Sequence, residues 1–350
     1  MECASLISMA LQQSSAKCAP RAKRSSLLIS LLLLLGAGYI WIGYVVFFPE
    51  LPSTDNPCIF YSNQCRGDIK LTLSYAIRQA KQSIFLQIYA LTDLDIIHLL
   101  QKKAEEGVEV RVFFDPSATS KKELEREAPL IAAFPQKEKG LMHRKILIID
   151  QSLVFLGSAN FTLQSLMFHD NLLVGIFHKD LAQFCLSQKN FSFSFLINGQ
   201  KAELIFLPDK EEKALCLLNT ILSSATKRIR IAMFTLTHPA IISTLIKKKE
   251  EGVSIRCAVD YYSGRGASKQ AIQHLKASHI ALFLSQGQQL LHHKWALIDD
   301  TTLVIGSANW TQSAFKRNAD CLLILQDLSP SQSKYLKKMW KVVKLEANKI

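Results

Sequence analysis

The chain repeats itself, and this internal duplication limits its fold more than any other feature of the sequence. Residues 84–115 align without a gap with residues 229–260, at an offset of 145. Residues 143–162 (HRKILIIDQSLVFLGSANFT) align with residues 292–311 (HHKWALIDDTTLVIGSANWT) at an offset of 149. Two copies of one unit predict two similar domains that pack about a pseudo-two-fold axis, as the subunits of an isologous dimer do.

The first aligned segment of each copy reads as strand, helix, strand. In the first copy, residues 84–89 form a short apolar run, and residues 94–103 space their apolar side chains as a helix does. Gly107 ends this helix, and residues 108–114, rich in β-branched and aromatic side chains, return as a parallel strand. A further helix is predicted ahead of each unit, near residues 70–81 and 211–226. Strands that alternate with helices predict an α/β fold, with helices on both faces of a sheet.

The second aligned segment of each copy is predicted to form a strand hairpin with a polar turn, at residues 150–152 and 299–301. Residues i and i+2 of a strand point to the same face, so the histidine and lysine that begin each segment project together. The GSAN turn then brings a serine and an asparagine back beside that histidine. The candidate site residues are His143, Lys145, Ser158 and Asn160, with His292, Lys294, Ser307 and Asn309.

This set of side chains is suited to a phosphodiester. Lysine ammonium groups and asparagine amides donate hydrogen bonds to the non-bridging phosphate oxygens. One histidine can attack phosphorus while the other protonates the leaving oxygen, which gives a phosphohistidine and two half-reactions. No CxxC motif or Cys/His cluster with zinc spacing occurs in the sequence, so neither a metal nor a cofactor is predicted.

Four aspartates near these motifs are predicted to support the site. Asp150 and Asp299 end their strands about 23 Å from the histidine, which favours a role in the turn or in packing. Asp170 and Asp320 begin the strand that follows each GSAN hairpin. We expect each of these two carboxylates to bind a ring nitrogen of a catalytic histidine and so to fix its tautomer.

HRKILIID with GSANFT and HHKWALID with GSANWT resemble the HxKx4D and GSxN motifs of the phospholipase D superfamily. The resemblance covers about residues 58–345 and looks closest to the compact bacterial endonuclease-like branch, here with two domains fused. It implies two phospholipase D-type α/β/α sandwich domains and a metal-independent phosphohistidine mechanism. It further implies that His143 is the nucleophile, His292 the general acid, and Lys145, Lys294, Asn160 and Asn309 the phosphate ligands. The sequence departs from the family's Asn-x-Glu, since it has Phe168-His169-Asp170 and Asn318-Ala319-Asp320 there.

An uncharged run of 22 residues, 27–48, is long enough to cross the hydrocarbon core of a membrane as a helix. Four basic residues lie within ten positions before it, and the first basic residue after it is Arg66, so the N-terminus is expected in the cytoplasm and the catalytic domains on the other side. A cleaved signal peptide is the alternative. The predicted organisation is a basic tail 1–26, a single transmembrane helix 27–48, a linker 49–57, and phospholipase D-like domains 58–200 and 201–350.

Charge and cysteine content leave the substrate and one disulfide open. The chain has 42 Lys+Arg against 29 Asp+Glu, a net charge of +13, of which +3 lies in residues 1–26. This basic body suits a phospholipid headgroup or a nucleic acid, or it is a solvated surface. Cys58 and Cys65 can pair if their compartment is oxidising, while Cys185, Cys216, Cys257 and Cys321 are expected to pack in the core.

The alternatives for function are a phospholipid hydrolase, a nuclease, a phosphatidyltransferase of the cardiolipin synthase type and a non-catalytic binding module. A lipid substrate is preferred, because an anchor would hold the site near headgroups. Both half-sites lie in one chain, so a monomer is expected to be active.

Overall fold

The computed structural model describes residues 30, 32, 34, 35, 48–187, 191–208 and 212–350. The chain divides into two compact units, Met1–Pro49 and Glu50–Ile350. The predicted tail (1–26) and nearly all of the predicted transmembrane helix (27–48) fall outside the described residues. Of the helices that are described, none is both long enough and apolar enough to cross a membrane.

The first half of the second unit carries seven strands. Its elements are β1 (Cys58–Tyr61), η1 (Asn63–Cys65), α2 (Ile69–Gln79), β2 (Ser83–Ile88), α3 (Leu94–Glu105), β3 (Glu109–Phe114), α4 (Lys121–Glu127), β4 (Ala132–Pro135), β5 (Lys145–Ile149), β6 (Leu153–Gly157), α5 (Leu163–Met167), β7 (Leu173–Phe177) and α6 (Lys179–Ser187).

The second half carries nine strands. Its elements are β8 (Ser192–Ile197), β9 (Gln200–Phe206), α7 (Lys213–Ser223), β10 (Arg228–Met233), α8 (Pro239–Glu250), β11 (Ser254–Val259), α9 (Tyr261–Arg265), α10 (Lys269–Ala277), β12 (Ala281–Ser285), β13 (Lys294–Ile298), β14 (Thr302–Gly306), α11 (Gln312–Lys316), β15 (Cys321–Leu325), α12 (Pro330–Leu345) and β16 (Ala347–Lys349).

The two sheets repeat one strand order, which confirms the duplication read from the sequence. The first sheet runs β1-β7-β6-β5-β2-β3-β4, and the second contains the equivalent series β9-β15-β14-β13-β10-β11-β12. The strands predicted to be parallel are parallel: β2 pairs with β3, and β10 pairs with β11. Beyond the shared series, β16 extends the second sheet at β12 and β8 extends it at β9.

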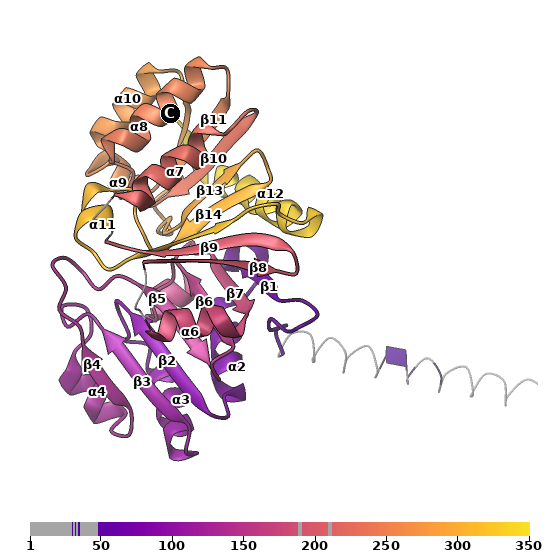
Figure 1. Ribbon diagram of the computed structural model, residues 1–350, viewed down its shortest axis with the longest axis vertical. Coiled ribbons are helices and arrows are strands. Elements are labelled where there is room, and N and C mark those ends of the chain that lie inside the picture. The colour runs from indigo at the N-terminus through magenta and orange to yellow at the C-terminus, as the bar shows by residue number, and fades with distance from the viewer. Residues whose placement is uncertain (1–29, 31, 33, 36–47, 188–190, 209–211) are drawn as a thin grey trace, which may run out of the picture. The chain divides into compact units, whose positions relative to one another are not determined.

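Each sheet buries both faces, and the alternation of side chains along one strand shows how. In β5, Leu147 and Ile149 belong to the core of the first half, whereas Ile146 and Ile148 belong to a central core. This central core also takes in Trp295 and Leu297 of β13, so the two sheets share it. Helices α6 and α12 complete it (Figure 1). In an α/β/α sandwich, helices alone cover both faces of the sheet. Here one face of each sheet is covered in part by the other half of the unit.

The predicted domain boundary between residues 200 and 201 falls at the start of β9, the counterpart of β1. Strand β8, which that boundary assigns to the first domain, pairs with β9 in the second sheet. Figure 1 shows this hairpin running across the junction between the halves.

Two predictions about cysteines need correction. Cys58 and Cys65 are both free, so the disulfide left open for them is not formed. Cys216 is exposed and not part of the core, because the buried face of α7 is formed by Ala214, Leu218 and Leu222. Cys185, Cys257 and Cys321 are buried, as the apolar runs around them predict.

Candidate functional site

The two motif histidines begin equivalent strands and are held by backbone bonds to the opposite half. His143 precedes β5, and its N–H donates to the carbonyl oxygen of Ala319 at 2.7 Å. His292 precedes β13, and its N–H donates to the carbonyl oxygen of Asp170 at 3.0 Å. Because the two bonds are reciprocal, the site lies where the halves meet and has the predicted two-fold pattern.

An aspartate carboxylate holds the backbone just before each motif histidine. Asp115, at the end of β3, accepts a hydrogen bond from the Met142 N–H at 2.8 Å. Its equivalent Asp260 accepts one from the Leu291 N–H at 3.2 Å. These two aspartates are paired at offset 145 in the sequence. Their hydrogen bonds to the backbone before the histidines were not predicted, because each bond joins segments about 30 residues apart.

The rings of the two histidines have chemically different partners. His143 Nδ1 lies 2.8 Å from Asp320 Oδ1, and the Ser307 hydroxyl donates to the same oxygen at 2.6 Å. His292 Nδ1 lies 3.0 Å from Asn171 Oδ1, which also accepts from the Ser158 hydroxyl at 2.8 Å. One imidazole therefore rests on a carboxylate and the other on a neutral amide, each from the opposite half.

The amide of Asn171 is held in one orientation. Its Nδ2 donates to the carbonyl oxygen of Ser165 at 2.8 Å, so Oδ1 is the atom that faces His292. An amide oxygen and a carboxylate can only accept, so both histidines donate from Nδ1 and turn Nε2 away from these partners.

The structure contradicts the prediction that Asp170 supports a histidine. Its side chain makes no hydrogen bond to either ring, and Asn171 occupies the position that Asp320 has in the other half. The signal was present in the sequence: the offset of 149 that aligns the GSAN turns pairs Asp320 with Asn171 and Asp170 with Ala319. The prediction for Asp320 agrees with its bond to His143.

Both motif lysines are buried and point into the shared site. Lys145 Nζ donates to the carbonyl oxygen of His143 at 2.7 Å, and Lys294 Nζ donates to that of His292 at 2.8 Å. Each ammonium keeps further hydrogens for a ligand. Burial lowers the pKa of Lys145 to about 7 and lowers that of Lys294 well below its usual range. A bound anion would favour the charged form of both.

An aromatic ring lies beside each His/Lys pair. The Tyr89 ring lies 5.2 Å from the His143 ring and 5.5 Å from Lys145 Nζ, measured to the ring centroid. Phe234 has the same place in the other half, 5.3 Å from the His292 ring and 5.1 Å from Lys294 Nζ. Tyr89 and Phe234 are equivalent at offset 145, but neither lies in the histidine and GSAN motifs that predicted the site. Each ring lies close enough to a lysine ammonium group for a cation–π interaction.

Burial and charge favour neutral histidines in the unliganded site. Burial, followed by the charge of Lys145, lowers the pKa of His143. Burial lowers the pKa of His292 well below its usual range, and Lys294 and Lys145 lower it further. Although burial acts to raise the pKa of Asp320, His143 and the Ser307 hydroxyl keep this carboxyl ionised. Each histidine is affected by both lysines, so the four groups form one site.

The remaining predicted residues separate into two groups. Asn160 and Asn309 are the last residues of the GSAN turns, and each has a buried amide oxygen without a partner in the described part of the chain. Asp150 lies away from the histidines and accepts from the N–H groups of Lys81, Gln82 and Ser83. Asp299 accepts likewise from Thr226, Lys227 and Arg228. These two carboxylates join the hairpin turns to the starts of β2 and β10.

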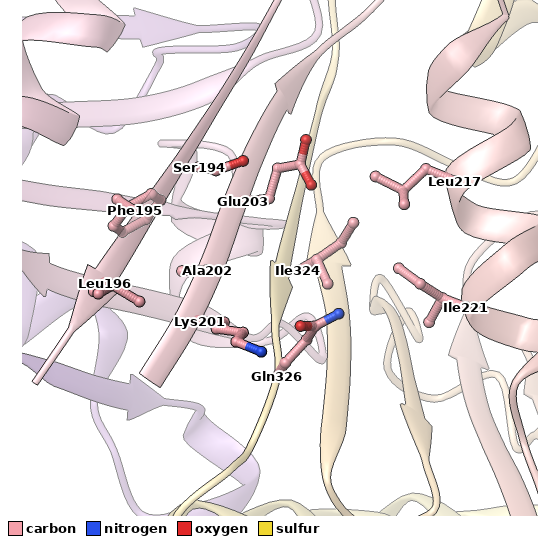
Figure 2. Close-up of a pocket in the computed structure, with 10 residues that line it drawn as sticks. All are labelled: Ser194, Phe195, Leu196, Lys201, Ala202, Glu203, Leu217, Ile221, Ile324 and Gln326. Carbon is pink, nitrogen blue, oxygen red and sulfur yellow. The ribbon is translucent and has the colours of Figure 1, made fainter. Parts of the chain in front are cut away.

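A separate pocket lies away from the motif residues. A pocket of about 310 Å³ lies between α7 and strands β8, β9 and β15, with Leu217 and Ile221 on one side and Lys201 and Glu203 on the other (Figure 2). None of the motif histidines or lysines lines it. Within the residues that the structure describes, no group of three or more His, Cys, Asp or Glu side chains could hold a metal ion.

Comparison with known proteins finds curated relatives that match part of the chain. The chain is 28% identical over 123 residues to a mitochondrial cardiolipin hydrolase of Xenopus laevis, a match covering 34% of the chain and 57% of that protein. It is 36% identical over 91 residues to a phospholipase D of Rickettsia conorii, covering 25% of the chain and 44% of that protein. The chain thus spans about half the length of the curated relatives it matches.

A solved structure shows the same fold across both halves. The phosphatidylserine synthase of Haemophilus influenzae superimposes with a TM-score of 0.70 and 14% identity, covering 86% of this chain and 89% of that one. The family model described as "Cardiolipin synthase, PLD-like domain" matches residues 73–190 and again residues 218–343, which together are more than half of the chain. With two matched domains and one shared site of paired histidines and lysines, the chain belongs to this PLD-like domain family of the phospholipase D superfamily.

Proposed function

We propose that the protein is a phospholipase D-type hydrolase that cleaves the headgroup ester of a phospholipid through a phosphohistidine. The observation that carries this proposal is the unequal pair of ring partners, Asp320 on His143 and Asn171 on His292. The two half-reactions need one histidine that is a nucleophile and one that gives and takes a proton. Unequal partners suit these two roles.

His143 is suited to attack phosphorus. The Asp320 carboxylate accepts its Nδ1 proton, which leaves the lone pair on Nε2 and stabilises the positive charge that develops on the ring. The Nε2–P bond forms as the bond from phosphorus to the leaving headgroup oxygen breaks. In this proposal Lys145, Lys294 and the two motif asparagines stabilise the charge on the non-bridging oxygens.

His292 is suited to move the proton. The neutral amide of Asn171 orients its ring without stabilising the imidazolium, so a protonated His292 is a strong acid. It gives its Nε2 proton to the leaving oxygen. It then takes a proton from water, whose oxygen attacks phosphorus and breaks the Nε2–P bond. An anionic substrate offsets the two lysines that disfavour the charged ring, so protonation accompanies binding.

A lipid substrate is favoured by the names of the matched relatives, which refer to cardiolipin and to a phospholipase. A membrane anchor at residues 27–48 would act in the same direction by raising the effective concentration of the site at a bilayer. A metal-independent nuclease and a phosphatidyltransferase are the alternatives. The basic body of the chain favours the first. The fold shared with a phosphatidylserine synthase favours the second.

The unit 50–350, expressed without the residues before it, tests these alternatives directly. We expect it to release headgroup and phosphatidic acid from phospholipid in detergent micelles, with EDTA present throughout, because the phosphate ligands are lysines and asparagines. A primary alcohol added to the assay should give a phosphatidyl-alcohol, since the phosphohistidine can pass its phosphatidyl group to either acceptor. Thin-layer chromatography or mass spectrometry of the lipids measures both products.

The nuclease alternative gives opposite results in parallel reactions with plasmid and single-stranded DNA. Nicked plasmid without phosphatidic acid, together with an affinity that falls steeply with salt, would identify a nuclease. Activity that disappears in EDTA and returns with Mg²⁺ would contradict the mechanism. Formation of phosphatidyl-alcohol with almost no phosphatidic acid would identify a transferase.

We further propose that residues 27–48 form a single-pass anchor, with the catalytic unit on the extracytoplasmic side. The proposal rests on the four basic residues that precede this run against Arg66 after it. Protease added to intact cells or spheroplasts should then digest the catalytic unit. A unit that becomes cleavable only after lysis would reverse the orientation.

A further inference from the structure

Asp170 is a buried carboxyl without a partner. The residue is 5% exposed, and its carboxyl makes no hydrogen bond or ion pair with any residue that the structure describes. Its carboxyl oxygens are not among the fully buried polar atoms without a partner, so they open onto the pocket that Asp170 lines, and their hydration there is reduced, which carries a cost. Such a group needs an explanation, such as a ligand that the protein binds.

The other half of the molecule shows that the fold does not need this carboxyl. Ala319 occupies the equivalent position and makes the same two backbone bonds. Its N–H donates to Leu141 at 2.8 Å, and its carbonyl accepts from His143 at 2.7 Å. For Asp170 the matching bonds join Leu290 at 2.9 Å and His292 at 3.0 Å. A methyl group suffices at this point of the fold, so the Asp170 side chain has another role.

Asp170 lines a small pocket whose other lining groups also carry oxygen. The pocket has a volume of about 120 Å³ and is formed by Asp170, Ser285, Gln286, Gln288, Gln289 and Glu346. Glu346 is held at its edge, since its carboxylate accepts from the Gln64 amide and its carbonyl oxygen accepts from the Gln286 N–H at 3.0 Å. No lysine, arginine or histidine lines the pocket.

We propose that this pocket binds a divalent cation, with Ca²⁺ as the best fit. Two carboxylates together with amide and hydroxyl oxygens form the hard, all-oxygen ligand set that Ca²⁺ and Mg²⁺ take. Ca²⁺ accepts the irregular geometry of long glutamine side chains, whereas Mg²⁺ demands a near-ideal octahedron. With only two carboxylates the binding is weak, with a Kd on the order of 10⁻⁴–10⁻³ M, as in extracellular Ca²⁺ modules.

The charges that line the pocket favour a positive ligand. Two carboxylates and no basic side chain line it, so a bound cation would offset the repulsion between Asp170 and Glu346.

The pocket is separate from the phosphate site but adjoins it. Asp170 and Asn171 are consecutive in an extended segment, so their side chains point to opposite sides. Asn171 contacts the His292 ring, while Asp170 faces the pocket with Glu346, just after α12. The cation would therefore join the C-terminal segment to the backbone that positions His292 without touching substrate.

Thermal unfolding of the full chain without substrate tests the proposal, with Ca²⁺ or Mg²⁺ added at constant ionic strength after dialysis against EDTA. For the wild type we expect Ca²⁺ at about ten times its Kd to raise Tm by about 2–4 °C. Asp170→Ala, which copies the residue of the other half, should abolish this rise, and Glu346→Gln should reduce it. Asp180→Asn, an exposed acid on α6, is the matched control and should respond like the wild type.

Isothermal titration calorimetry of the same variants gives a second measurement. Ca²⁺ binding that is present in the wild type and Asp180→Asn but absent in Asp170→Ala supports the site. If Asp170→Ala does not fold, loss of binding in Glu346→Gln supports it instead. Equal Ca²⁺ responses in the wild type and both pocket variants would overturn the proposal. So would a wild type that binds no Ca²⁺, which would leave Asp170 as a protonated acid. Neither result depends on the enzyme's substrate.

Discussion

His143→Asn is expected to lower turnover by on the order of 10⁴- to 10⁶-fold, because the enzyme loses the atom that forms the covalent intermediate. Asparagine keeps a polar group of similar size beside Asp320, so the fold should persist. The loss should be the same for every phosphodiester substrate, whatever its leaving group. Steady-state kinetics with a phospholipid and with an aryl phosphodiester measure it, and circular dichroism checks the fold.

His292→Asn is expected to behave differently on these two substrates. Its loss should be about 10²- to 10⁴-fold on phospholipid, the usual contribution of a general acid. With an aryl phosphodiester, the rate of phosphohistidine formation should fall much less, because the phenolate leaves without a proton. That step is measured as a burst of phenolate.

The exposed His274 on α10 supplies the control, and His274→Asn should match the wild type. A wild-type rate in either motif variant would contradict the shared site. A burst in His143→Asn but none in His292→Asn would exchange the two roles.

The repeat made the fold predictable at the level of elements. Apolar runs and the spacing of residues 94–103 predicted β2, α3 and β3, and the structure has them at Ser83–Ile88, Leu94–Glu105 and Glu109–Phe114. These elements are defined by neighbours in sequence, so their patterns survive in a single chain. The turns at Asp150 and Asp299 were predictable for the same reason.

Contacts between the halves were not predictable in the same way. The sequence does not say that the ring of His143 binds a residue of the other half, since residues 143 and 320 are 177 positions apart. The predicted boundary separates β8 from β9, although the two strands form a hairpin. Only the pairing of β9 with β15, a strand more than 100 residues away, shows that the hairpin belongs to the second sheet. The error at Asp170 arose because a carboxylate was expected beside each histidine, whereas the alignment at offset 149 pairs Asp320 with the amide Asn171.

The asymmetry of the ring partners leads to a prediction about Asp320. Asp320→Asn keeps a side chain of the same shape, but a neutral amide no longer stabilises the charge that develops on His143. Its NH₂ group can also face the ring and reverse the tautomer, which removes the lone pair from Nε2. We expect kcat to fall by about 10²- to 10⁴-fold with little change in KM. A variant with wild-type kcat would show that the carboxylate does not activate the nucleophile.

Asn171→Asp is the converse change. It should shift the alkaline limb of the pH profile of kcat more than it lowers the maximal rate. A carboxylate beside Nδ1 favours the imidazolium, so it raises the pKa of His292 above the strongly lowered value that burial and the lysines give it. The acid form then persists to higher pH, and the alkaline limb of kcat moves upward. At the same time His292 becomes a weaker acid, so the maximal rate falls.

Asn171→Ala provides the comparison, because it removes the orienting bond without adding charge and should lower kcat while leaving the limb in place. The pH profile of kcat for the three proteins measures both effects. An alkaline limb that does not move in Asn171→Asp, while Asn171→Ala is impaired, would mean that Asn171 only orients the ring and that His292 does not carry the proton that controls this limb.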